Sequence, residues 1–178
     1  MGTAARPDYE GLLALVMHKK LPERQELPLS LGVAPEVLPP SKPPESTWVP
    51  SVLVIGGPLP DLDRQRLEKR GCQVEVVPDF VEGLKRMDEG RWDVVVVHPH
   101  VQADADGLKF VRQFKHLRPE DLPEEFKSVC SRYKHTPFVI LPVPETSQFA
   151  IFRTSDDWTL ADVNKASIAE AILNARTL

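Results

Sequence analysis

Four consecutive valines, Val94 to Val97, constrain the fold of this chain more than any other feature. All four are apolar and β-branched, so the strand that they form must be covered on both faces. A central parallel strand of an α/β sheet meets that requirement. In open α/β sheets, binding sites lie just beyond the carboxyl ends of such strands. His98, Pro99 and His100 follow here and are therefore the first candidates for a functional site.

From residue 51 onward, apolar strands alternate with amphipathic helices. Strands are predicted over 52–55, 73–77, 93–97, 137–142 and 158–161, and helices over 61–70, 79–87, 106–116 and 167–175. Strands separated by helices indicate βαβ units with right-handed crossovers. The sequence therefore predicts an α/β protein, a three-layer α/β/α sandwich around a five-stranded parallel sheet.

Two segments interrupt this alternation. Residues 122–133 carry apolar side chains at helical spacing, which predicts an inserted amphipathic helix. Residues 146–154 stand where the topology requires a helix, although Phe149 to Phe152 favours a strand. We expect a short degenerate element there and take 158–161 as the fifth strand. A hairpin that joins the two segments around Asp156-Asp157 is the alternative.

A proline-rich stretch separates this region from the N-terminus. Five of the 18 prolines lie between residues 39 and 50, which excludes a helix or a central strand and predicts an extended linker. Residues 1–38 are predicted to form a helical arm, and residues 51–178 the main domain.

The arm contains one predicted helix, over 9–20, which begins after Asp8. Leu12, Leu15 and Val16 are expected to share one apolar face. An isolated helix of this length is only marginally stable in water. The arm is therefore expected to pack on the main domain or on a partner.

Charge and hydropathy argue against several classes of function. A net charge of -4, with no dense lysine and arginine cluster, gives no attraction to nucleic acid. The longest apolar runs, 12–16 and 94–97, are too short to cross a bilayer, and the first residues lack the pattern of a secretory signal. Cys72 and Cys130 match no metal or redox spacing. We expect a cytoplasmic protein with neither nucleic acid nor membrane as a partner.

The order of the motifs resembles a known family. Asp93 to Val97 is followed by Asp106-Gly107-Leu108 at the start of a helix, and then come residues 136–141 and 155–160. Over residues 51–178 this order is similar to the receiver (CheY-like) domain of bacterial two-component response regulators. The resemblance implies a flavodoxin-like sheet and a role in signal transduction.

The chain departs from that family at each position of its phosphorylation chemistry. Receivers need an acidic pair after the first strand for magnesium, an aspartate after the third, a hydroxyl after the fourth and a lysine after the fifth. The corresponding residues here are Gly56, Gly57, His98 (or Pro99 with a one-residue shift), Pro142, and Ala161 or Asp162. None of them supplies the required group.

The resemblance therefore implies a pseudo-receiver, a non-enzymatic protein of signalling or regulation without aspartyl phosphorylation and without a cofactor. Such a protein acts by binding another protein: a kinase, a regulator or a second copy of itself in a homodimer. For its partner surface, Phe149, Phe152 and Arg153 lie on the face that receivers use, where exposed aromatic rings would form a docking patch. Ordinary core packing of the two rings is the favoured alternative.

A metal site is the second hypothesis. Imidazole and carboxylate groups ligate zinc and iron, and His98, His100, Asp104 and Asp106 lie close together in the sequence. The protein would then be a metal carrier or a metal-dependent enzyme. A surface loop with a half-buried His98 is the simpler explanation.

A nucleotide site is the third hypothesis. The Gly56-Gly57-Pro58 turn follows the first strand, where glycine lets backbone amides approach a phosphate. The full G-x-G-x-x-G pattern of a flavodoxin-like nucleotide-binding protein is absent from the sequence. A tight turn is therefore favoured over a phosphate cradle.

Overall fold

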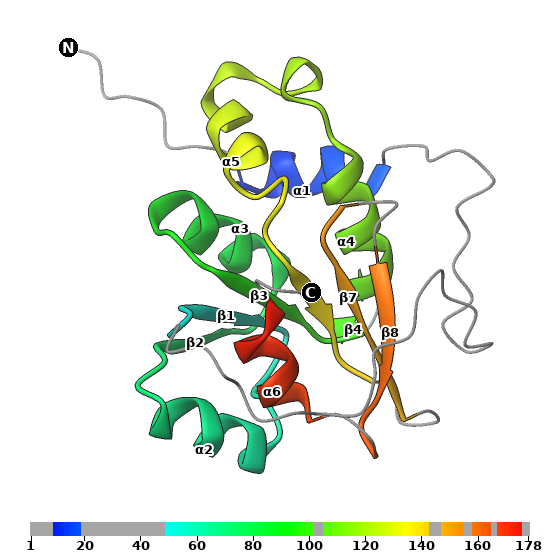
Figure 1. Ribbon diagram of the computed structural model, residues 1–178. Coiled ribbons are helices and arrows are strands. Elements are labelled where there is room, and N and C mark those ends of the chain that lie inside the picture. The colour runs from blue at the N-terminus through cyan, green and yellow to red at the C-terminus, as the bar shows by residue number, and fades with distance from the viewer. Residues whose placement is uncertain are drawn as a thin grey trace.

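The computed structural model describes residues 9–18, 49–101, 105–142, 147–154, 158–164 and 167–175. One six-stranded sheet runs through it (Figure 1), made of β1 (Val52–Ile55), β2 (Val74–Val77), β3 (Val94–Val97), β6 (Phe138–Ile140), β7 (Gln148–Phe152) and β8 (Trp158–Asp162). A separate two-stranded ribbon pairs β4 (His100–Val101) with β5 (Ala105–Asp106).

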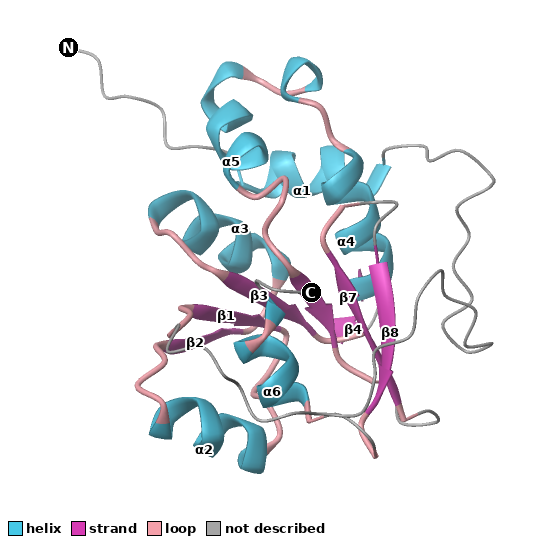
Figure 2. Cartoon of the chain, viewed as in Figure 1, coloured by secondary structure: helices cyan, strands magenta, loops and turns pink. Residues whose placement is uncertain are grey.

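Helices flank the sheet on both sides, as the colouring by secondary structure shows (Figure 2). They are α1 (Tyr9–His18), α2 (Asp61–Lys69), α3 (Phe80–Glu89), α4 (Gly107–His116), α5 (Lys127–Arg132) and α6 (Ile168–Leu173), with 3₁₀ turns η3 (Pro119–Asp121) and η4 (Glu124–Phe126). The view in Figure 1 places α1, α3, α4 and α5 on one side of the sheet, and α2 and α6 on the other. None of the described helices is long and apolar enough to cross a membrane.

The strand order is β2-β1-β3-β6-β7-β8, and the sheet is mixed. The strands β2, β1, β3 and β6 are parallel, whereas β7 pairs antiparallel with both β6 and β8. The predicted five-stranded, all-parallel CheY-like sheet is therefore wrong. The strand-forming segment at 148–152 adds to the edge of β6 instead of crossing over as a helix. The alternative hairpin is the correct pairing, although residues 155–157 at its tip lie outside the described residues.

The valine strand lies within the sheet, as predicted. Val94 to Val97 are all fully buried, and β3 pairs with β1 on one side and β6 on the other. Val95 and Val97 belong to the core on the α3 and α4 side, and Val94 and Val96 to the core on the α2 and α6 side. The β3 strand therefore joins two separate apolar cores.

The N-terminal helix packs on the main domain. Leu12 and Val16 of α1 are buried in the core that α3 and α4 also line, and the Tyr9 hydroxyl donates a hydrogen bond of 2.6 Å to Asp88 Oδ2. Leu15 is 45% exposed, so its predicted place on the buried face is wrong. Tyr9, Leu13 and Met17 also pack against the core, so the buried arc of α1 extends from Leu12 in the direction opposite to Leu15. The predicted linker lies outside the described residues except for Val49 and Pro50.

The insertion before β6 is less regular than predicted. The expected helix over 122–133 is the 3₁₀ turn η4 followed by the short helix α5. Phe126, Val129 and Tyr133 are nevertheless buried, as their spacing indicates. The Tyr133 hydroxyl lies 2.9 Å from the Met87 carbonyl oxygen, which anchors α5 at the end of α3.

Candidate functional site

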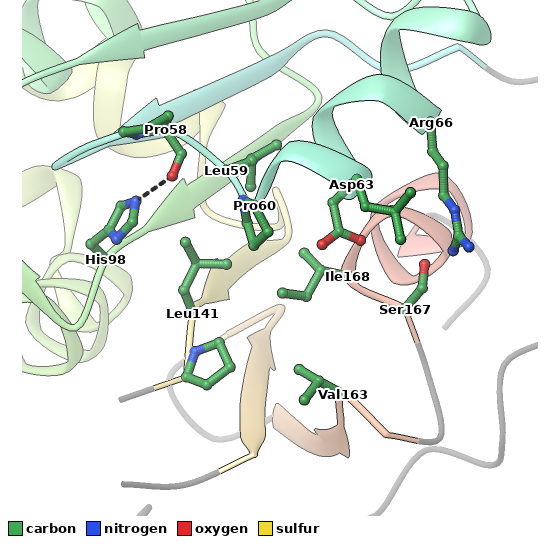
Figure 3. A pocket seen from close by; sticks show the side chains of 12 residues that line it. Pro58, Leu59, Pro60, Asp63, Arg66, His98, Leu141, Val163, Ser167 and Ile168 are labelled. Carbon is green, nitrogen blue, oxygen red and sulfur yellow. Dashed lines mark hydrogen bonds between the residues drawn. The ribbon is translucent and has the colours of Figure 1, made fainter. Parts of the chain in front are cut away.

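A pocket of about 710 Å³ opens at the carboxyl ends of the parallel strands (Figure 3). Its walls come from the loops after β1, β3, β6 and β8 and from the first turns of α2 and α6. They comprise Pro58, Leu59, Pro60, Leu62, Asp63, Arg66, His98, Leu141, Pro142, Val163, Ser167 and Ile168. The chain leaves β1 toward β2 and leaves β3 toward β6, so the pocket lies where the strand order reverses. Ligands of open α/β sheets bind at such a point.

His98 forms part of the wall at the end of β3. Its amide donates to the Ile55 carbonyl at 3.0 Å and continues the pairing of β3 with β1. Its ring Nε2 lies 3.0 Å from the Pro58 carbonyl oxygen, the contact dashed in Figure 3. A Cβ placed on Gly57 would lie 3.4 Å from the same nitrogen. The imidazole therefore covers the glycine turn.

The polar side chains of the pocket serve the fold. Asp63 Oδ1 accepts a hydrogen bond of 3.0 Å from the Ala169 amide, and Ser167 Oγ accepts one of 3.0 Å from the Glu170 amide. Arg66 lies 3.9 Å from the Glu170 carboxylate. The contacts of Asp63 and Arg66 join α2 to the start of α6, and Ser167 caps α6 itself. What remains toward the cavity is chiefly apolar.

The positions corresponding to receiver phosphorylation converge only in part. Gly56, Gly57, His98 and Pro142 all follow parallel strands at the carboxyl edge. Ala161 instead lies inside β8 and is 2% exposed, because the strand continues to Asp162. Ala161 therefore lies one residue before the end of β8, which is Asp162. The edge thus brings together two glycines, an imidazole and a proline.

The metal hypothesis concerns residues that are described only in part. The backbones of His100 and Asp106 pair across the β4–β5 ribbon, while Asp104 lies outside the described residues. Among the described side chains, no three histidine, cysteine or acidic groups gather as metal ligands would. The metal site stays a prediction.

The glycine turn does not resemble a phosphate cradle. The His98 ring covers Gly57, and Pro58 and Pro60 contribute no N–H group. Asp61 and Asp63 place negative charge in the first turn of α2, where a phosphate would need positive potential. The tight turn is the better interpretation.

The two aromatic rings proposed for a partner surface belong to the core. Phe149 and Phe152 of β7 are both fully buried, one on each face of the sheet. They form no exposed patch, because β7 is covered on both faces. Arg153 is half-buried at the end of β7, beside a second pocket at the opposite edge of the sheet.

Sequence reasoning missed a buried cation in α4. Lys115 is 6% exposed, and its Nζ donates to the carbonyl groups of Tyr133, Lys134 and Thr136. It also lies 4.5 Å from the centre of the Phe138 ring. Burial lowers the pKa of Lys115 to about 7. Its spacing of four from the apolar Val111 was the available signal.

Comparison with known proteins adds no assignment to these observations. No family model, no curated protein and no solved structure matches the chain. The geometry of the pocket is therefore what supports a function.

Proposed function

We propose that this chain is a non-enzymatic binding protein that holds an apolar segment of a protein partner in the pocket at the carboxyl edge. One observation carries the proposal. Large apolar side chains are exposed at five described positions, and two of them, Leu62 at 60% and Val163 at 38%, line this pocket. Apolar side chains gathered at a concave surface mark an interaction site, whereas scattered ones do not.

The size and chemistry of the pocket suit such a partner. A volume of about 710 Å³ is in the range of binding pockets, and Leu59, Leu141 and Ile168 supply apolar walls. Burial of one large aliphatic or aromatic side chain there would contribute about 1.5–3 kcal/mol. An extended partner segment with one or two apolar side chains is therefore the expected occupant.

The absence of catalysis is part of the proposal. Asp63 and Ser167 hold the start of α6, and His98 holds the Pro58 carbonyl, so within the described lining the polar groups already have structural partners. A nucleophile needs an adjacent base in reach, and an oxygen cage needs several carboxylates. We propose a signalling or regulatory role in the cytoplasm, with a kinase, a regulator or a second copy of the chain as the partner.

Charge substitutions at the rim test the binding proposal. Leu62→Lys and Val163→Lys each place a cation beside the apolar pocket, and Val76→Lys, at a residue that is 42% exposed on β2, is the matched control. The wild type and each variant are used as bait to capture proteins from a lysate of the native host. Sedimentation equilibrium measures the self-association of each. We expect one captured protein, or the dimer, to fall about tenfold in the two rim variants only. Equal capture and equal self-association in the wild type, the two rim variants and the control would contradict the proposal.

Phosphoryl transfer tests the non-enzymatic part separately. The chain is incubated with labelled acetyl phosphate and magnesium. We expect no aspartyl phosphate, because no aspartate directly follows β3, and no alkali-stable phosphohistidine, because the His98 Nε2 is engaged with the Pro58 carbonyl oxygen. Stoichiometric labelling would overturn this part and leave the binding surface to the rim variants.

A further inference from the structure

A second pocket, of about 480 Å³, lies at the opposite edge of the sheet, at the amino ends of β3 and β6. Its polar lining comprises Asp93, Arg132, His135, Thr136 and Arg153. The reversed direction of β7 brings Arg153 here. Because β7 runs antiparallel to β6, it ends at the edge of the sheet where β3 and β6 begin. The feature that overturned the all-parallel sheet therefore also builds this pocket.

One of its two guanidinium groups is held firmly in place. Arg132 Nη1 donates to the carbonyl oxygens of Met87, Asp88 and Gly90 at 3.2, 3.2 and 3.1 Å. These bonds fix the Arg132 head group at the end of α3, where carbonyl groups and a cation attract each other. A guanidinium held in this way loses little conformational entropy when it binds a further group.

The charges around the pocket do not balance. Arg132 and Arg153 contribute two positive charges. Among the described residues that line the pocket, Asp93 is the single acidic one, and its Oδ2 already accepts a hydrogen bond of 2.8 Å from the Ser51 amide. The described lining therefore contains two arginines and one carboxylate, and that carboxylate has a structural role.

We propose that this pocket binds an oxyanion, a phosphate or carboxylate group of a small ligand. The planar fork of arginine matches two oxygens of such a group, and a charge-assisted hydrogen bond is about twice as strong as a neutral one. The site lies at the edge opposite to the apolar pocket, so it stands independently of the proposed protein partner.

Titration with the anions alone tests the site. The full chain is titrated with inorganic phosphate and separately with acetate at constant ionic strength, and the backbone amide shifts of residues 132–136 are followed by NMR. Arg153→Gln removes one fork. Arg64→Gln, on the exposed face of α2, removes the same charge at a distance and is the control.

We expect saturable shifts in the wild type. The affinity for the anion should fall about tenfold in Arg153→Gln and stay unchanged in Arg64→Gln. Tighter binding of phosphate than of acetate would assign a phosphoryl group, and the reverse a carboxylate. Should Arg153→Gln unfold, Arg153→Lys keeps the charge but loses the fork, and about threefold weaker binding is expected. Shifts that fail to saturate with both anions, or equal binding by wild type and the Arg153 variants, would overturn the proposal.

Discussion

The imidazole of His98 covers Gly57, with 3.4 Å between its Nε2 and the place of a Cβ on the glycine. Gly57 also has φ +147°, a backbone conformation that other residues rarely adopt. We expect Gly57→Ala to lower the free energy of unfolding by about 1–3 kcal/mol. Gly71→Ala is the control, because Gly71 has φ +83° and nothing lies within 4 Å of its Cβ position. Urea unfolding measures the free energy of unfolding of both variants. Gly57→Ala should cost less when His98→Ala is also present, and an equal cost with and without His98→Ala would contradict the contact.

The backbone of His98 sets a second limit, at the start of α4. A Cβ on Gly107 would lie 2.0 Å from the His98 carbonyl oxygen, whereas a Cβ on Gly83 would meet the end of the Ile55 side chain at 2.6 Å. A side-chain end can rotate away, but a paired backbone cannot. We expect Gly107→Ala to cost about 3 kcal/mol or more and Gly83→Ala clearly less. Thermal unfolding of the two variants checks this order, and a reversed order would contradict the packing of α4 on the end of β3.

Docking of the N-terminal helix gives a third prediction. Leu12 is 1% exposed in the core beneath α3 and α4, and Leu15, on the same helix, is 45% exposed. We expect Leu12→Ala to cost about 2–5 kcal/mol and Leu15→Ala at most about 0.5 kcal/mol. Chemical unfolding with a single cooperative transition is the measurement. Equal, small effects of both substitutions would show that α1 does not contribute to the core.

The buried Lys115 predicts how stability depends on pH. Its pKa falls from the ordinary 10.5 to about 7 in the folded chain, because burial disfavours the charged form. Above pH 7 the folded state therefore loses a proton that the unfolded state keeps, and stability rises with pH. Between pH 7 and 9 the slope should approach at most about 1.4 kcal/mol per pH unit. Lys115→Met should remove that rise, and parallel curves for wild type and variant would contradict the pKa.

The sequence predicted the parts of the fold that local patterns determine. Val94 to Val97 require cover on both faces wherever they pair, so their position was predictable. The predicted start of a helix at residue 79 was equally local, because the Asp79 carboxylate caps α3 by accepting from the Glu82 amide at 2.9 Å. The direction of β7 was not local, because Phe149 to Phe152 can pair with either orientation of a neighbour, and the edge of β6 decides it.

The site was harder to predict than the fold. His98 was expected at the carboxyl edge, and it lies there beside Pro142. Leu62 and Val163, which carry the proposed function, are about 100 residues apart and join one pocket only because α2 begins, and β8 ends, at the same edge. Arg153 depends on tertiary pairing in the same way, and no spacing in the sequence marks it. Lys115 differs, because its spacing of four from the apolar Val111 was a signal in the sequence.

Site-specific photocrosslinking from the pocket rim tests the central claim most directly. A benzophenone side chain replaces Leu62 in one version of the chain and Val76 in another, and both are irradiated in the native host. The proposed function predicts one predominant crosslinked protein, or a crosslinked dimer, from position 62 that is absent from position 76. Identical adducts from the two positions, or none specific to 62, would contradict a binding site at this pocket.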